Sequence, residues 1–350
     1  MRGFPDTEYA ARLHAAQRHM TEAGLGAVLL TIDTDIRYFR GFLTRFWESP
    51  SRPWFLVLPQ AGRPIAVIPS IGAALMGQTW VKDIRTWSAP DPEDDGVSLL
   101  ADTLREVGGP VGLPHGRESY LRMPLGDFDL LKAASGLTFT DDHGIVAALR
   151  EVKSEAEIDK ITVSCKIAER AFDRVPEIAR AGVTLDQVFR DFQRLLLEEG
   201  AEWVPYLAGG AGQAGYGDVI SPATSAPLAE GDILMLDTGV IRDGYFCDYN
   251  RNFAVGPPAA DAAAAHARLI EATAAGFEAA RPGITASELF RVMADITGGG
   301  ETAGRLGHGL GLQLTEGLSL SAKDHSVLQA GMVITLEPGI DIAPGRMLVH

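Results

Sequence analysis

The sequence predicts two domains: an α/β domain over residues 1–147 and, over residues 148–350, a second domain built on an internal repeat. Two observations support this division. Short β-rich runs alternate with helical patterns in the first 143 residues, which is typical of an α/β domain. In the remainder, two pairs of segments match each other in the same order, about 100 residues apart. A chain of 350 residues is long enough to bury two separate cores.

Helical and extended patterns follow one another through the first domain. Apolar and small residues at helical spacing predict a helix over residues 8–23, which Gly24 would end. Three short β-rich runs come next, AVLLTI, WFLVLP and PIAVIP, and helical patterns return near residues 95–107 and 125–135. Ser154 and Glu157 then form a capping box, which predicts the start of a long helix and a domain boundary between residues 143 and 153.

The second domain contains the internal repeat. The segment ARAGVTLDQVFR at 179–190 matches ARPGITASELFR at 280–291, and each pattern predicts a helix that starts after a turn. Further along, PLAEGDILMLDTG at 227–239 matches VLQAGMVITLEPG at 327–339. The two offsets are 101 and 100 residues, so a chance similarity of turn sequences is the less favoured explanation. The repeat suggests two copies related by approximate two-fold symmetry.

Composition and charge exclude several classes of protein. Hydrophobic residues make up 46% and charged residues 22% of the chain, as in globular proteins. The net charge of −15 argues against a nucleic-acid partner. No segment has the roughly 18–20 apolar residues of a membrane span, and the N-terminus does not resemble a secretory signal. Only two cysteines occur, without metal-binding spacing, so we expect a cytoplasmic protein with no membrane partner.

Two carboxylates occupy equivalent positions in the repeat. Asp237 and Glu337 each follow an apolar run, ILML and VITL, so each acid is expected to end a buried strand. Two-fold symmetry would turn both side chains toward a shared centre. Converging buried carboxylates need a shared proton, a basic partner or a metal ion.

Asp248 and His308 favour the metal ion. Asp243-Gly244 is a good hairpin turn, which would bring Asp248 back beside Asp237. The glycines around His308 leave its imidazole accessible. One histidine with several carboxylates suits Mn, Co, Fe or Zn, and three or more carboxylates suit two cations ~3.5–4 Å apart. The sequence therefore predicts a site for two divalent ions, with the metal ligands Asp237, Asp248, His308 and Glu337.

These motifs, DTG followed by an aspartate, then GHG and LEPG, resemble the pita-bread metallopeptidases. That family includes methionine aminopeptidase, Xaa-Pro aminopeptidase, prolidase and creatinase. The resemblance is strong over residues 150–350, and the N-terminal part is similar to the small domain of the creatinase branch. It implies a creatinase-like α/β domain, an α+β pita-bread domain and a homodimer. It also implies that Asp237 chelates one metal, that Asp248 bridges both, and that His308 and Glu337 bind the second.

Three positions depart from the family pattern. The family's fifth ligand, a bridging glutamate, is expected just beyond His350, so the chain reads as truncated at its C-terminus or as a compromised form. Thr315 and Ile220 stand where the peptidases have functional histidines, whereas the acidic neighbour Glu316 is retained. These two changes favour a relative that has kept the metals and altered its substrate.

The expected function is hydrolysis of a peptide or other amide bond at this dinuclear site, as in an Xaa-Pro aminopeptidase or dipeptidase. Glu337 or Glu316 would move the proton. One alternative is a hydrolase or lyase of the same family that acts on a small metabolite, of the ectoine or dimethylsulfoniopropionate type. Another alternative is a non-catalytic pita-bread binding module.

Candidate substrate-binding residues lie in three segments. Residues 42–55 include Arg45 and Arg52, which could bind a substrate carboxylate, and Trp47, which could wall the pocket, although a core strand with its loop is the simpler interpretation. Tyr206 and Tyr216 belong to a Gly-rich segment, YLAGGAGQAGYGD, which is expected to be a loop near the site and lacks the context of a nucleotide-binding loop. Thr315 completes the set.

Overall fold

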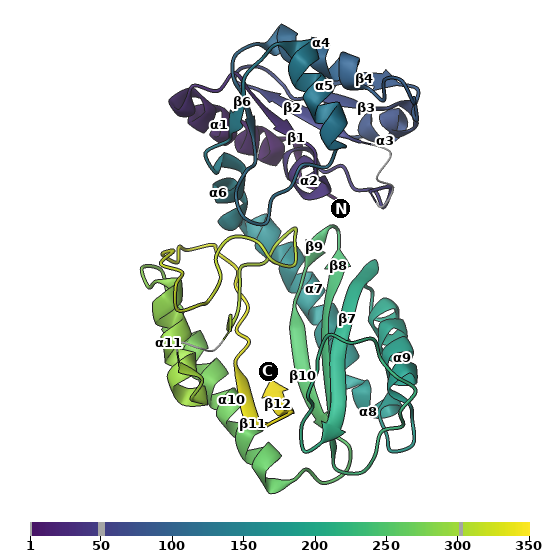
Figure 1. Cartoon of the computed structure of the whole chain (residues 1–350), viewed down its shortest axis with the longest axis vertical. Coiled ribbons are helices and arrows are strands. Elements are labelled where there is room, and N and C mark those ends of the chain that lie inside the picture. The colour runs from purple at the N-terminus through teal and green to yellow at the C-terminus, as the bar shows by residue number, and fades with distance from the viewer. Residues whose placement is uncertain (1, 48–52, 301–303) are drawn as a thin grey trace. The chain divides into compact units, whose positions relative to one another are not determined.

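The computed structural model describes residues 2–47, 53–300 and 304–350. The chain divides into two compact units, Met1–Arg150 and Glu151–His350 (Figure 1). The division predicted from the sequence lies three residues earlier, between residues 147 and 148. Among the described residues, every helix is too short or too polar to cross a bilayer.

The first unit is a mixed six-stranded sheet with the strand order β4-β3-β2-β1-β5-β6. The three predicted β-rich runs form its central antiparallel strands, and the outer pairs are parallel. Its strands are β1 (Ala27–Leu30), β2 (Phe55–Pro59), β3 (Ile65–Pro69), β4 (Asp83–Trp87), β5 (Val111–Leu113) and β6 (Phe139–Asp141). Its helices are α1 (Asp6–Ala23), α2 (Asp33–Arg40), α3 (Ala73–Met76), α4 (Val97–Val107), α5 (Leu125–Ser135) and α6 (Ile145–Glu151), with a 3₁₀ turn at Ser70–Gly72. As predicted, α1 ends at Gly24, which has a φ of 69°.

The second unit contains an antiparallel sheet of order β10-β8-β7, with β9 paired to β8, and a separate pair β11-β12. Its strands are β7 (Trp203–Gln213), β8 (Asp232–Arg242), β9 (Tyr245–Phe246), β10 (Tyr249–Ala254), β11 (Gly339–Ala343) and β12 (Arg346–Val349). Its helices are α7 (Glu155–Asp173), α8 (Val175–Ile178), α9 (Leu185–Glu198), α10 (Ala260–Ala279) and α11 (Ala286–Thr297).

Strand β8 is buried on both faces, which explains why its sequence is a continuous apolar run. Leu234 and Leu236 pack in a core with residues of α7 and α9. Ile233 and Met235 point to the other face, into a core with residues of α10 and β12. The strand that carries Asp237 is therefore packed between two hydrophobic cores.

The predicted internal repeat is confirmed by matching backbone hydrogen bonds in the two copies. Gly182 donates to the Leu228 carbonyl at 2.8 Å, and Gly283 donates to the Leu328 carbonyl at 2.9 Å. The helix starts also correspond, because isolated bridges join Thr184 to Pro227 and Thr285 to Val327. The capping box predicted at Ser154 is present at the start of α7.

Two local predictions are wrong. The Gly-rich segment expected to be a loop forms much of β7, because its glycines allow close backbone approach: a Cβ on Gly209 would lie 2.2 Å from the Met235 carbonyl oxygen. Asp237 lies within β8 rather than at its end, because the strand continues to the hairpin turn. That turn is at the predicted place, with φ of 50° at Asp243 and 83° at Gly244.

Candidate metal centre

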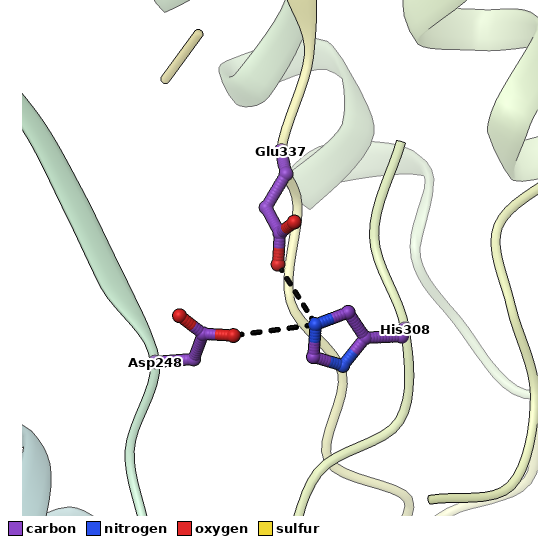
Figure 2. Close-up of side chains that lie close together, drawn as sticks. All are labelled: Asp248, His308 and Glu337. Atoms are coloured by element: carbon purple, nitrogen blue, oxygen red, sulfur yellow. Dashed lines mark ion pairs between the residues drawn. The ribbon is translucent and has the colours of Figure 1, made fainter. Parts of the chain in front are cut away.

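Three of the four predicted metal ligands meet at one point in the second unit. Asp248 lies just before β10, His308 lies in the segment 304–310, and Glu337 lies just before β11. Each offers a ligand atom, and these atoms lie within 4.8 Å of one another (Figure 2). His308 Nε2 is 3.2 Å from Asp248 Oδ2 and 3.2 Å from Glu337 Oε1.

A hydrogen bond from Nδ1 fixes the orientation of the His308 imidazole ring. Nδ1 lies 2.9 Å from the Gly309 carbonyl oxygen, which can only accept, so Nδ1 carries the proton. Nε2 then faces two carboxylates, which requires either a second proton or a cation between these groups. Burial disfavours charge on His308, but the carboxylates of Asp248 and Glu337 beside Nε2 outweigh burial and raise its pKa to about 9.

The fourth predicted ligand, Asp237, is joined to this group through Tyr206. The Tyr206 hydroxyl is 3.1 Å from Asp237 Oδ1 and 2.7 Å from Asp248 Oδ1. A hydroxyl has one proton, so it donates to only one of these carboxylates at a time. Burial, with the nearby charges of Asp248 and Glu337, raises the pKa of Asp237 to about 7.

The cluster fits a divalent cation. Two carboxylates face one imidazole, a third is joined to them through Tyr206, and converging buried carboxylates are unfavourable without a counter-charge. Glu337 Oε1 is buried, and no described donor is oriented to hydrogen-bond to it although His308 Nε2 is nearby. Carboxylate oxygens with one imidazole nitrogen suit first-row transition ions, and a bound ion would neutralise the set.

Alternating glycines allow other backbone segments to approach His308 closely. A Cβ on Gly307 would lie 2.2 Å from the Thr335 carbonyl oxygen, and one on Gly309 would lie 2.0 Å from the Glu316 carbonyl oxygen. The GHGLGL pattern is therefore a packing requirement as well as a ligand motif.

Thr335 is a supporting residue that the sequence reasoning missed. Its hydroxyl accepts from the His308 backbone N–H at 3.0 Å, and its own N–H donates to the His308 carbonyl at 2.8 Å. The sequence signal for this role was a polar residue, threonine, inside the apolar run VITL, two residues before Glu337.

Other predicted residues of this unit have different surroundings. Glu316 is buried in an ion pair with Lys153, 2.9 Å away, and is not among the three grouped ligands. Tyr216 is buried in a core, where its hydroxyl donates to Asn252 Oδ1 at 3.0 Å and accepts from the Val349 N–H at 2.7 Å. Thr315 is half-buried and Ile220 is 87% exposed. The catalytic role of Glu316 and the substrate-binding roles of Tyr216 and Thr315 stay predictions.

Arg45 and Trp47 belong to the first unit. Arg45 is exposed. The ring centroids of Trp47 and Trp54 are 5.9 Å apart, and the guanidinium of Arg122 lies over the Trp47 ring. Arg52 lies outside the described residues. Because the metal ligands all belong to the second unit, a substrate-binding role for these residues stays a prediction.

Both units match known families and known proteins. Residues 159–350 match the metallopeptidase family M24, and residues 12–152 match the creatinase/prolidase N-terminal domain. The probable dipeptidase PepE of Mycobacterium tuberculosis is 31% identical over 352 residues, which cover 99% of this chain and 91% of that protein. The Xaa-Pro dipeptidase of Pyrococcus horikoshii is 32% identical over 227 residues, which cover 63% of this chain and 64% of that protein.

Solved structures show the same architecture over the whole chain. Dipeptidase PepE from Mycobacterium ulcerans has a TM-score of 0.82 at 28% identity, covering 99% of this chain and 93% of that chain. The prolidase from Pyrococcus horikoshii has a TM-score of 0.83 at 23% identity, covering 97% and 93%, and shares the fold. The chain therefore belongs to metallopeptidase family M24, with a creatinase-type N-terminal domain, and is a metal-dependent hydrolase.

Proposed function

We propose that the chain is a dipeptidase that uses two divalent metal ions, with Asp237, Asp248, His308 and Glu337 among their ligands. The observation that carries the proposal is the meeting of Asp248, His308 and Glu337 around one point. Relatives that match over 99% and 63% of the chain are named probable dipeptidase and Xaa-Pro dipeptidase, which makes dipeptides the first substrates to test. Manganese is one of the ions that this donor set suits, beside cobalt, iron and zinc.

The oligomeric state and the cellular location of the enzyme form part of the same proposal. The resemblance to the creatinase and Xaa-Pro aminopeptidase branch supports a homodimer. The net charge of −15 and the two cysteines, without metal-binding spacing, support a cytoplasmic enzyme. Gel filtration with light scattering tests the dimer, and a single monomeric peak of 37.4 kDa would contradict it.

The described residues have separate tasks in this mechanism. Asp237, Asp248, His308 and Glu337 would hold the ions, which would supply Lewis-acid polarisation of the scissile carbonyl and a lowered pKa of nearby water. His308 offers Nε2, because Nδ1 donates to Gly309. Tyr206 orients the carboxylates of Asp237 and Asp248. Of the two predicted acids, Glu337 is better placed to accept and return a proton, because the carboxylate of Glu316 is paired with Lys153.

Dipeptide hydrolysis by metal-loaded protein tests the proposal. Chelator-treated protein is incubated with Mn²⁺, Co²⁺ or Zn²⁺ and assayed on dipeptides with and without proline at the second position, while elemental analysis measures bound metal. We expect about two equivalents of metal and hydrolysis that disappears with the chelator. Bound metal without hydrolysis of any dipeptide would contradict the substrate class, and absence of bound metal would contradict the mechanism.

A further inference from the structure

A buried ion pair lies beside the metal centre and is not among the grouped ligands. Lys153 Nζ is 2.9 Å from Glu316 Oε1, and the two side chains are 2% and 7% exposed. Taking both charges out of water is unfavourable, and well-packed apolar residues often serve stability equally well. Stability alone is therefore a weak explanation for this pair.

The backbone of Glu316 is bonded directly to the residue that orients His308. The Glu316 N–H donates to the Gly309 carbonyl at 3.0 Å, and His308 Nδ1 donates to the same oxygen at 2.9 Å. A shift of Glu316 would therefore move the acceptor that fixes the imidazole ring. Glycine at 311 leaves room for the ion pair, because a Cβ there would lie 2.0 Å from Glu316 Oε1 and 2.9 Å from Lys153 Cε.

Lys153 is anchored to the segments that carry the other ligands. Its N–H donates to the Gly331 carbonyl at 2.9 Å, in the turn that leads to Glu337, and its Nζ donates to the Glu151 carbonyl at 3.1 Å. The carbonyl of Gly311, the glycine that leaves room for the pair, accepts from the Phe246 N–H at 2.9 Å, two residues before Asp248. The pair thus lies where the three ligand-bearing segments are bonded together.

We infer that Lys153 and Glu316 are positioning residues, whose buried ion pair sets the orientation of the His308 imidazole and thereby the metal affinity of the centre. The inference rests on the proposed metal site and assigns Glu316 a structural task in place of proton transfer. Residues that orient a metal ligand from behind typically contribute about 10–100-fold to metal affinity or activity. We expect an effect of that size here, transmitted through the Gly309 carbonyl.

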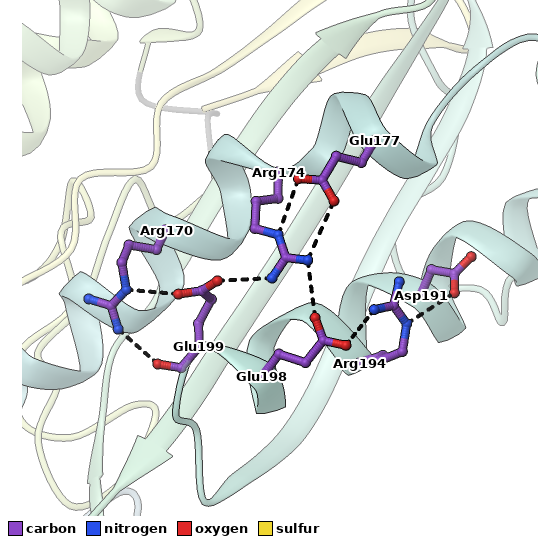
Figure 3. Close-up of polar contacts among 7 residues, drawn as sticks. All are labelled: Arg170, Arg174, Glu177, Asp191, Arg194, Glu198 and Glu199. Carbon is purple, nitrogen blue, oxygen red and sulfur yellow. Dashed lines mark hydrogen bonds and ion pairs between the residues drawn. The ribbon is translucent and has the colours of Figure 1, made fainter.

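The test replaces both charges at once, so that neither is left buried alone. The double variant Lys153→Met/Glu316→Leu is compared with wild type and with Arg194→Met/Glu198→Leu, which removes an exposed pair on α9 (Figure 3). Titration with Co²⁺, followed by its absorption spectrum, measures metal affinity and ligand geometry without relying on activity. Thermal melting and the separate values of kcat and KM complete the comparison.

We expect the buried double variant to melt close to wild type but to bind Co²⁺ about 10–100-fold more weakly, with an altered cobalt spectrum and reduced kcat. The surface double variant should match wild type in Co²⁺ affinity. An affinity within twofold of wild type and an unchanged spectrum in the buried double variant would overturn the inference and leave the metal site intact. Failure of wild type to bind Co²⁺ would overturn both proposals.

If the double variant does not fold, the single variant Glu316→Gln tests the same inference. Glu316→Gln keeps the shape of the side chain and an acceptor for Lys153 but removes the negative charge. A folded Glu316→Gln protein with weaker Co²⁺ binding and a shifted spectrum supports positioning. The same protein with wild-type affinity and spectrum overturns it.

Discussion

Two groups of charged side chains in the second unit have opposite characters. On the surface of α7–α9, three arginines alternate with acids, so that each charge faces an opposite one (Figure 3). At the metal centre the carboxylates of Asp248 and Glu337 face one imidazole (Figure 2), Asp237 is joined to them through Tyr206, and the residues are largely buried. Water screens the surface charges, so their pairing adds little to stability. The buried excess of carboxylates is unfavourable unless a cation compensates it, and it therefore marks a binding site.

Removing the histidine ligand should give the largest effect. His308→Ala deletes the one nitrogen donor of the cluster and leaves the carboxylates in place. We expect Mn²⁺ affinity to fall by more than about 100-fold, beyond the range seen for supporting residues, and hydrolysis to be lost with it. Calorimetric titration measures the affinity, with the exposed His19→Ala as control. Wild-type Mn²⁺ binding by His308→Ala would remove this residue from the ligand set.

Crowding the backbone beside the ligand His308 should give the second-largest effect. Gly309→Ala would place a Cβ 2.0 Å from the Glu316 carbonyl oxygen, so the two segments must separate. We expect a loss of about 1–3 kcal/mol in the free energy of unfolding, as for other overpacked sites, together with weaker metal binding.

The same substitution elsewhere gives the control for Gly309→Ala. Gly126 lies in α5, and a Cβ added there would meet nothing within 4 Å, so Gly126→Ala should be neutral or stabilising by up to about 1 kcal/mol. Urea denaturation measures both variants. Equal stabilities for the two would show that close packing at Gly309 has no energetic importance.

Removing the tyrosine hydroxyl should have a smaller effect. Tyr206→Phe keeps the ring but deletes the group that contacts both Asp237 and Asp248. We expect Mn²⁺ affinity to fall about 10-fold, near the lower end for supporting residues. The exposed Tyr120→Phe is the matched control. If Tyr206→Phe bound Mn²⁺ as tightly as wild type, the hydroxyl would not orient the ligands.

The surface network should give the smallest effect. Arg174 pairs with Glu177, Glu198 and Glu199, yet these side chains are solvent-accessible and screened. Arg174→Met should leave metal affinity and hydrolysis unchanged and should shift the melting temperature only slightly, mainly at low salt. A large, salt-independent drop in melting temperature would show that the exposed ion pairs contribute substantially to stability. The two regions would then differ less in energetic importance than their difference in burial suggests.

Local chemistry accounts for what could be predicted from the sequence. The capping box at Ser154, the end of α1 at Gly24 and the hairpin turn at Asp243-Gly244 depend on neighbouring residues, so short motifs identify them. The repeat and the ligand motifs can likewise be recognised as residue patterns in the sequence. They led to the family and to the candidate ligands, three of which the fold brings together.

Only the tertiary structure decided which distant groups support that site. Lys153 stands in the polar stretch EVKSEAEID, where no local pattern indicates burial, yet it is buried against Glu316. Tyr206 reads as a loop residue, yet strand pairing directs its hydroxyl at two aspartates. Such contacts depend on which segments stack beside each other and in which register, and residue periodicity within one segment carries no information about its partner.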